Sequence, residues 1–169
     1  MTDNPGAEAS HNVVARPTGK GRFQAAIEVR GGTIIADEPV EAGGLGSGPT
    51  PYELLSSALA ACTAMTMRLY AERKGWTLPP YSVAAAHSIV PAGEDGTPPR
   101  DLFTRNIAFA GPVEGEMEAK LLSVADKCPV HRTLMRGFEI RTNIGSVMRP
   151  LTPDPAQQHE HDMEAACDD

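Results

Sequence analysis

Largely apolar residues recur along the segment 51–74 at the spacing of an amphipathic helix. They follow the i, i+3, i+4, i+7 pattern of one buried stripe: Leu55, Ala58, Leu59, Cys62, Met65, Thr66 and Leu69. Thr50 is suited to cap this helix, Pro51 to begin it and Gly75 to end it. At ~1.5 Å per residue the helix would be roughly 35 Å long, enough to cross a whole domain.

Alternating and β-branched residues predict strands on both sides of the helix. Between His11 and Ala36, two such runs flank Gly31-Gly32 and predict a hairpin. The later pattern predicts strands at 81–90 and 105–111, a helix at 114–127, a helical turn at 131–137 and a last strand at 138–144. The Gly-rich stretch 43–49 lacks the Lys-Ser/Thr of a phosphate-binding loop and predicts a flexible connection. The fold class is α+β.

The formal charge of −7 belongs to the ends of the chain. Residues 148–169 hold six acidic residues and one arginine, and residues 1–10 hold two acids, so the body is formally neutral. We expect a disordered N-terminus at 1–10, a single domain at 11–147 and an acidic disordered tail at 148–169. A neutral body also argues against nucleic-acid binding, which needs a clustered basic surface.

Composition further limits the class of protein. The length suits one domain with its own core, and no run of about 18 uncharged apolar residues predicts a membrane span. The first residues lack the features of a secretory signal, and three widely spaced cysteines do not suggest a disulfide framework. We therefore expect a soluble cytoplasmic protein.

Two cysteines are candidates for chemistry. Cys62 stands in the apolar run SSALAACTAMTM, where a free thiol ordinarily packs as a small hydrophobic side chain with a raised pKa. Cys128 stands in DKCPVHRTL beside basic residues, at a helix junction that could favour a thiolate. On this evidence alone, ordinary packing is the better interpretation of Cys62, whereas Cys128 could equally be reactive or ordinary packing.

The two motifs together resemble the OsmC/Ohr family of osmotically inducible and organic hydroperoxide resistance proteins. The segment GPTPYELLSSALAACTAMTMRLYAERKGW, followed by ADKCPVHRTL, is similar to that family's long central helix and its later Cys-Pro motif. The resemblance covers roughly residues 12–145. It implies an OsmC-like fold, with antiparallel sheets packed around a long central helix and a second helix, in an intertwined homodimer.

The resemblance also implies a thiol-dependent peroxidase without cofactor or metal. Cys62 would attack an organic hydroperoxide and become a sulfenate, and Cys128 would condense with it to a disulfide. An external dithiol would restore both thiols.

The activating residues depart from the family pattern. The family places a glutamate ten residues before its first cysteine, but Tyr52 stands there and Glu53 is nine before. On a regular helix Glu53 would lie on the opposite side from Cys62, whereas ten residues leave about 80° between them. Glu53 is thus either an activating acid or a first-turn acid favoured by the helix dipole.

The activating cation is also open. Arg22 is the first candidate, with Lys20 and Arg30 behind it, and a surface strand arginine is the alternative. His131 could be a base or cation near Cys128, or it could cap or pack there. His87 could approach the same pocket or be a partly buried strand residue.

Two other hypotheses compete with the peroxidase. A non-catalytic redox-sensing or ligand-binding relative would keep the fold and both thiols. A metal site built from Cys62, Cys128 and His131 would lack the usual CxxC spacing, and His159, His161 and Cys167 are metal-capable types in a tail expected to be disordered.

Overall fold

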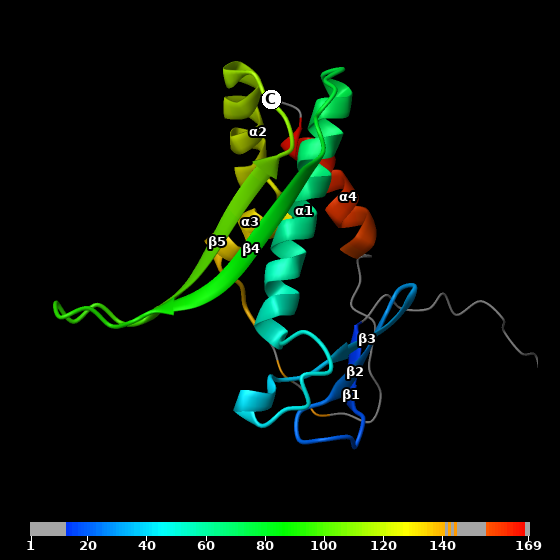
Figure 1. Ribbon diagram of the computed structural model, residues 1–169, viewed down its shortest axis with the longest axis vertical. Coiled ribbons are helices and arrows are strands. Elements are labelled where there is room, and N and C mark those ends of the chain that lie inside the picture. The colour runs from blue at the N-terminus through cyan, green and yellow to red at the C-terminus, as the bar shows by residue number, and fades with distance from the viewer. Residues whose placement is uncertain (1–12, 141, 143, 145–154, 168–169) are drawn as a thin grey trace, which may run out of the picture. The chain divides into compact units, whose positions relative to one another are not determined.

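The computed structural model describes residues 13–140, 142, 144 and 155–167 (Figure 1). They fall into two compact units. The first holds 13–49, 140, 142, 144 and 155–158, and the second holds 50–139 and 159–167. The predicted disordered segment 1–10 lies outside the described residues.

The first unit contains a three-stranded antiparallel sheet. Its strands β1 (Val14–Pro17), β2 (Ala25–Val29) and β3 (Gly32–Ala36) lie in the order β1-β2-β3. The predicted hairpin is confirmed as β2–β3, with Val29 opposite Gly32. Gly31 has a φ of 92° in the turn, a backbone conformation that favours glycine.

The Gly-rich connection is held in place by a buried carboxylate, which differs from the expected flexible loop. Asp37 is 2% exposed and accepts hydrogen bonds from the backbone N–H groups of Glu38, Leu45 and Ser47 and from the Ser47 hydroxyl. Burial opposes the charge on Asp37, but the bonds from Ser47, Glu38 and Leu45 hold its pKa below the ordinary value. A short 3-10 helix, η1 (Val40–Ala42), lies within this connection.

The second unit is built around the long predicted helix, α1 (Pro51–Arg73). The Thr50 hydroxyl accepts from the Glu53 N–H at 3.2 Å, and the Glu53 carboxylate accepts from the Thr50 N–H at 2.7 Å. This capping box satisfies two backbone donors that the start of a helix otherwise leaves unpaired. Helix α1 ends as predicted at Lys74 and Gly75, whose φ is 67°.

The buried face of α1 differs from the predicted stripe. Leu59, Cys62 and Thr66 are buried as predicted. Leu55 and Met65 of the predicted stripe are instead 38% and 55% exposed, and Thr63, outside the stripe, is fully buried. The hydroxyls of Thr63 and Thr66 donate to carbonyl oxygens one turn earlier, which removes the cost of burying them. Because apolar side chains occupy nearly every side of α1, their spacing alone could not select the buried face.

A long hairpin lies along α1 (Figure 1). Strand β4 (Tyr81–Val90) pairs antiparallel with β5 (Arg100–Phe109), from Tyr81 opposite Phe109 to Val90 opposite Arg100. Both strands are confirmed, although β5 begins five residues earlier than predicted. Alternate side chains along each strand are partly buried, as expected of a sheet with one covered face.

Two buried clusters hold the helices of the second unit together. Helix α2 (Gly115–Asp126) confirms the second predicted helix and packs through Leu121 and Val124 against Met67 and Tyr70 of α1. Helix α3 (Pro129–Arg136) confirms the predicted helical turn. Its N-terminal residues lie beside a smaller cluster formed by Leu59, Cys62 and Cys128.

Part of the acidic tail is helical, which differs from the expected disorder. Helix α4 (Pro155–Ala166) carries Ala166 and Cys167 into the core at 3% and 5% exposure. His159, Met163, Ala166 and Cys167 stand at i, i+4, i+7 and i+8, which places them on one narrow face. That face was missed because acidic residues surround it and its first member is polar.

The predicted last strand is wrong for the described residues of 138–144, which form no strand. Phe138, Ile140 and Ile144 are 64%, 78% and 105% exposed. A strand requires a neighbouring strand for its hydrogen bonds, so an alternating pattern alone does not form one.

By length and composition alone, α1 is also apolar enough to cross a membrane, with a mean hydropathy of 1.2 over 18 residues. The sequence did not predict this. However, 44% of that window is buried inside the structure, and the core helix of a soluble protein meets the same criterion. The packing of α1 against β4, α2 and α3 identifies it as a core helix of its unit.

Candidate active site

Cys62 lies in the middle of α1 and is 3% exposed. Small residues precede it on the helix, so the neighbouring elements approach closely at this point. Its side chain belongs to a buried cluster with Leu59 and Cys128, against which Phe103 and Leu134 pack. Cys62, Cys128 and Cys167 are all free thiols in the structure.

Cys128 lies at the N-terminus of α3 and is fully buried. The sequence Cys-Pro fixes this position, because proline suits the first turn of a helix and lacks the N–H that would be unpaired there. The Cys128 sulfur accepts from the backbone N–H of His131 at 3.4 Å and from the Thr63 hydroxyl at 3.8 Å. The backbone N–H of His131 makes this contact, and a role of its side chain as a base or cation stays a prediction.

The two thiols titrate as a hydrogen-bonded pair. The bond from the Cys62 thiol is the largest cause that lowers the pKa of Cys128, to about 6, and the His131 N–H and the Thr63 hydroxyl assist against the opposing effect of burial. The same bond to Cys128 raises the pKa of Cys62, and burial raises it further. The first negative charge of the pair therefore resides on Cys128.

Arg105 supports the Cys128 side of the pair through Thr63. Its guanidinium donates to the Thr63 hydroxyl at 3.0 Å, to the Ala125 carbonyl at 2.9 Å and to the Asp126 carboxylate at 2.7 Å. Sequence analysis missed Arg105. The available signal was an arginine on the inward face of β5, alternating with Phe103 and Ile107.

His159 lies against the other thiol. Its Nε2 atom is 3.5 Å from the Cys62 sulfur, and α4 carries the histidine there. Sequence analysis considered His159 only as a metal-capable residue in a disordered tail, because nothing in the sequence connects it to a cysteine 97 positions earlier.

The structure does not join the predicted activating acid to Cys62. The Glu53 carboxylate is engaged in the capping box at the start of α1, and no described contact links it to either thiol. The interpretation of Glu53 as a first-turn acid therefore accounts for its position.

The predicted cation belongs to the first unit. Arg22 is exposed and its guanidinium carbon lies 5.3 Å from the centre of the Phe23 ring. Its pairing with Cys62, like that of the alternatives Lys20 and Arg30, stays a prediction.

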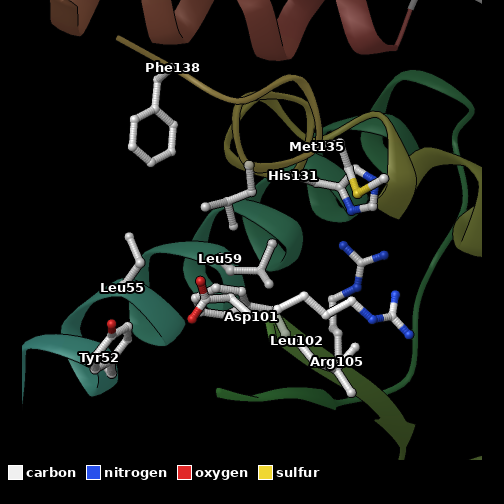
Figure 2. Close-up of a pocket in the computed structure, with 12 residues that line it drawn as sticks. Tyr52, Leu55, Leu59, Asp101, Leu102, Arg105, His131, Met135 and Phe138 are labelled. Carbon is white, nitrogen blue, oxygen red and sulfur yellow. The ribbon is translucent and has the colours of Figure 1, made fainter. Parts of the chain in front are cut away.

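An open pocket of about 870 Å³ borders the thiol cluster (Figure 2). Tyr52, Leu55 and Leu59 line it along α1, and Arg105 and His131 lie toward the opposite end. Leu59, Phe103 and Leu134 line the pocket and also pack against the two cysteines, so one layer of side chains separates the pocket from the sulfurs. His87 lies beside this pocket, stacked on Tyr52 with ring centroids 3.9 Å apart, and bonds Asp101 at 2.7 Å.

Within the described part of the chain, no group of three or more histidine, cysteine, aspartate or glutamate side chains could hold a metal ion. The hypothetical set of Cys62, Cys128 and His131 is therefore not assembled as a metal site.

Residues 44–143 match the model of the OsmC-like protein family. A search of curated proteins found no match. Among solved structures, an organic hydroperoxide resistance protein OsmC from Legionella pneumophila is similar, with 22% identity and a TM-score of 0.55 over 77% of this chain and 93% of that one.

Two further solved structures give the same result. An OsmC-like protein from Mycoplasma pneumoniae has 22% identity and a TM-score of 0.57, over 76% of this chain and 89% of that one. The organic hydroperoxide resistance protein OhrB of Bacillus subtilis has 19% identity and a TM-score of 0.54, over 75% and 90%. These similarities establish the α+β fold with its two small antiparallel sheets.

Proposed function

Because the chain belongs to the OsmC-like family and gathers two free cysteines in one buried cluster, we propose that it is a thiol-dependent peroxidase for organic hydroperoxides. The observation that carries the proposal is the burial of Cys62 and Cys128 side by side in one small cluster. Cys62 and Cys128 are 66 positions apart in the sequence, so it is the fold that brings them together. Some solved relatives are named organic hydroperoxide resistance proteins, which agrees with this activity.

In the proposed reaction, the thiolate of Cys62 attacks one oxygen of the peroxide O–O bond. A sulfur–oxygen bond forms, the O–O bond breaks, and the alkoxide takes a proton to leave as an alcohol. Sulfur is oxidised to a sulfenic acid and the peroxide is reduced. No metal or prosthetic group enters the reaction.

Cys128 then acts as the resolving thiol. Its thiolate attacks the sulfur of the Cys62 sulfenic acid, the S–S bond forms, and the oxygen leaves as water after taking a proton. The lowered pKa of Cys128, about 6, supports this role because the thiolate is the attacking species. An external dithiol reduces the disulfide by exchange and completes the cycle.

The neighbouring pocket suits an organic peroxide better than hydrogen peroxide. Apolar side chains form most of its wall, and a volume of about 870 Å³ accommodates a large alkyl or acyl group. The separating layer of Leu59 and Leu134 must shift for the peroxide to reach Cys62.

The exposed apolar side chains support a homodimer. Leu55 and Met65 of α1 and Phe138 after α3 are 38%, 55% and 64% exposed. Exposed hydrophobic groups of this size are commonly covered by a partner. A soluble, cytoplasmic homodimer that needs neither nucleic acid nor membrane is the assembly we propose.

The experiment is the consumption of cumene hydroperoxide in the presence of excess dithiothreitol. The wild-type protein should turn over, Cys62→Ser should reduce the rate to background, and Cys128→Ser should prevent the intramolecular disulfide. Cys167→Ser keeps both Cys62 and Cys128 and should still form the intramolecular disulfide, because Cys167 lies in the other buried cluster. Full activity of Cys62→Ser would contradict the proposal.

A redox sensor is the second candidate, and the engagement of Glu53 in its own helix cap favours it. A sensor would form the Cys62–Cys128 disulfide stoichiometrically with peroxide but would turn over slowly with every peroxide tested. Comparison of the single-turnover disulfide yield with the steady-state rate separates the two functions.

A further inference from the structure

Helix α4 is attached to α1 by several contacts within the second unit. The Cys167 thiol donates to the Thr66 carbonyl at 3.9 Å, and the Arg73 guanidinium donates to the Glu164 carbonyl at 3.0 Å. Cys167 also belongs to the core cluster of Met67 and Tyr70. The residues that carry α4 lie beyond the end of the family match at residue 143. The attachment of α4 is therefore a feature of this chain.

This attachment places an imidazole against the Cys62 thiol. Cys128 receives hydrogen bonds from the His131 N–H and the Thr63 hydroxyl, whereas the Cys62 sulfur is contacted by His159 Nε2 at 3.5 Å. The carboxylate of Glu53 is committed to its helix cap. Besides Cys128, His159 is therefore the side chain of the described second unit that is placed to exchange a proton with Cys62.

We propose that His159 is a catalytic acid–base residue, the proton partner of Cys62. This inference rests on the proposed peroxidase function. The Nε2 atom of neutral His159 accepts the proton of the Cys62 thiol and leaves a thiolate–imidazolium pair. The thiolate attacks the peroxide, the S–O bond forms as the O–O bond breaks, and the imidazolium returns its proton to the departing alkoxide. The products are the Cys62 sulfenic acid, the alcohol and neutral His159.

The same residue decides which sulfur bears the negative charge. When the Cys62 thiol keeps its proton and donates a hydrogen bond to Cys128, the charge lies on Cys128, where the His131 N–H and the Thr63 hydroxyl also stabilise it. When the proton of Cys62 is on His159, the imidazolium stabilises a thiolate at Cys62 as a neighbouring cation does. The second arrangement is the one that the first step of the reaction needs.

A direct test measures the reactivity of each cysteine rather than peroxidase turnover. The reduced full-length protein is treated with iodoacetamide at pH 7, and the alkylation rate of each cysteine is followed by mass spectrometry. His159→Gln keeps a hydrogen-bonding side chain but cannot take a proton. We expect it to slow alkylation of Cys62 by a factor of about ten or more, since a positioned general base contributes typically 10²–10⁴-fold. His161→Gln, an exposed histidine on the same helix, should leave the rate unchanged.

Cys167 serves as the internal reporter of helix attachment. It is 5% exposed, so its slow alkylation indicates that α4 is still bound. Slow Cys167 together with slowed Cys62 in His159→Gln supports the proposal. Slow Cys167 with an unchanged Cys62 rate overturns it.

A second variant covers the case in which His159→Gln releases α4. Ala166→Glu introduces a charge at a position 3% exposed and should detach the helix while retaining His159. If His159 is the proton partner, Cys62 becomes slower in this variant as well. If Cys62 becomes faster or is unaffected, α4 is only a cover and the proposal is wrong.

The outcome also separates this inference from the proposed function. Loss of turnover in Cys62→Ser together with an unaffected Cys62 alkylation rate in His159→Gln refutes the inference alone. Full turnover in Cys62→Ser refutes the peroxidase, whatever His159 does to alkylation.

Discussion

Cys62 and Cys128 are both buried and are in contact, yet their surroundings have opposite effects on ionisation. Cys128 caps a helix, so a backbone N–H points at its sulfur, and a threonine hydroxyl adds a second donor. Cys62 lies inside a helix, where the N–H groups of its own helix are already used. The bond to Cys128 and burial raise the pKa of Cys62 by more than the Val130 N–H and the Thr66 hydroxyl lower it. Both thiols are buried, so it is the position of each cysteine relative to a helix start that decides where a thiolate is stabilised.

Removal of each thiol in turn should have the largest effect on the ionisation of the other. In Cys128→Ala we expect the thiolate that forms near pH 6 to disappear, because Cys128 is the thiol with the lowered pKa and burial still raises the pKa of Cys62. In Cys62→Ala the pKa of Cys128 should rise above about 6, because the largest cause that lowers it is gone.

Thiolate absorbance at 240 nm, followed between pH 5 and 9, measures both variants, and Cys167→Ser supplies the control. A transition near pH 6 that persists in Cys128→Ala would contradict the assignment of the lowered pKa to Cys128. In that case Cys62 carries the low pKa, and the cap position of Cys128 is not decisive.

A smaller effect, on the free energy of unfolding, is expected from Arg105, which contacts Cys128 indirectly through Thr63. Arg105→Gln removes donors from the Thr63 hydroxyl, the Ala125 carbonyl and the Asp126 carboxylate, on a side chain only 14% exposed. We expect a loss of roughly 2–3 kcal/mol in the free energy of unfolding, the cost of losing charged hydrogen bonds in a mostly buried place.

Urea denaturation measures this loss at one pH. Arg100→Gln is the matched control, since Arg100 is exposed at the far end of the same strand. Equal stability of the two variants would mean that Arg105 does not hold β5 to α1 and α2.

The sequence predicted local structure well, because helix ends and hairpins are encoded by neighbouring residues. Thr50, Pro51 and Gly75 were sufficient to place both ends of α1, and Gly31 placed the first hairpin. The family was also accessible, since its two cysteine motifs are contiguous stretches of sequence.

The site was less predictable, because its contacts join distant residues. Cys62 and Cys128 were predicted as partners only through the family resemblance. Arg105 and His159 were not predicted as partners of the thiols, because they reach Thr63 and Cys62 across separations of 42 and 97 residues. A polar residue on an apolar face is the one local signal that both share.

The smallest expected effect concerns Glu53, which lies in the first turn of α1 and makes no described contact with either thiol. A capping role and an activating role make different demands on the side chain. Gln can accept the hydrogen bond from the Thr50 N–H as well as Glu does, but it carries no charge. If Glu53 only caps α1, Glu53→Gln should keep both stability and peroxide turnover, while Glu53→Ala should cost about 1 kcal/mol of stability.

Thermal denaturation and turnover measured on the same two variants decide between the roles. A normal melting temperature with a large loss of turnover in Glu53→Gln would make Glu53 an activating carboxylate after all. Cys62 would then be assisted from the start of its own helix, and the contrast between the two thiols would be smaller than the described contacts imply. We expect the opposite result, because the carboxylate is already engaged by the Thr50 N–H at 2.7 Å.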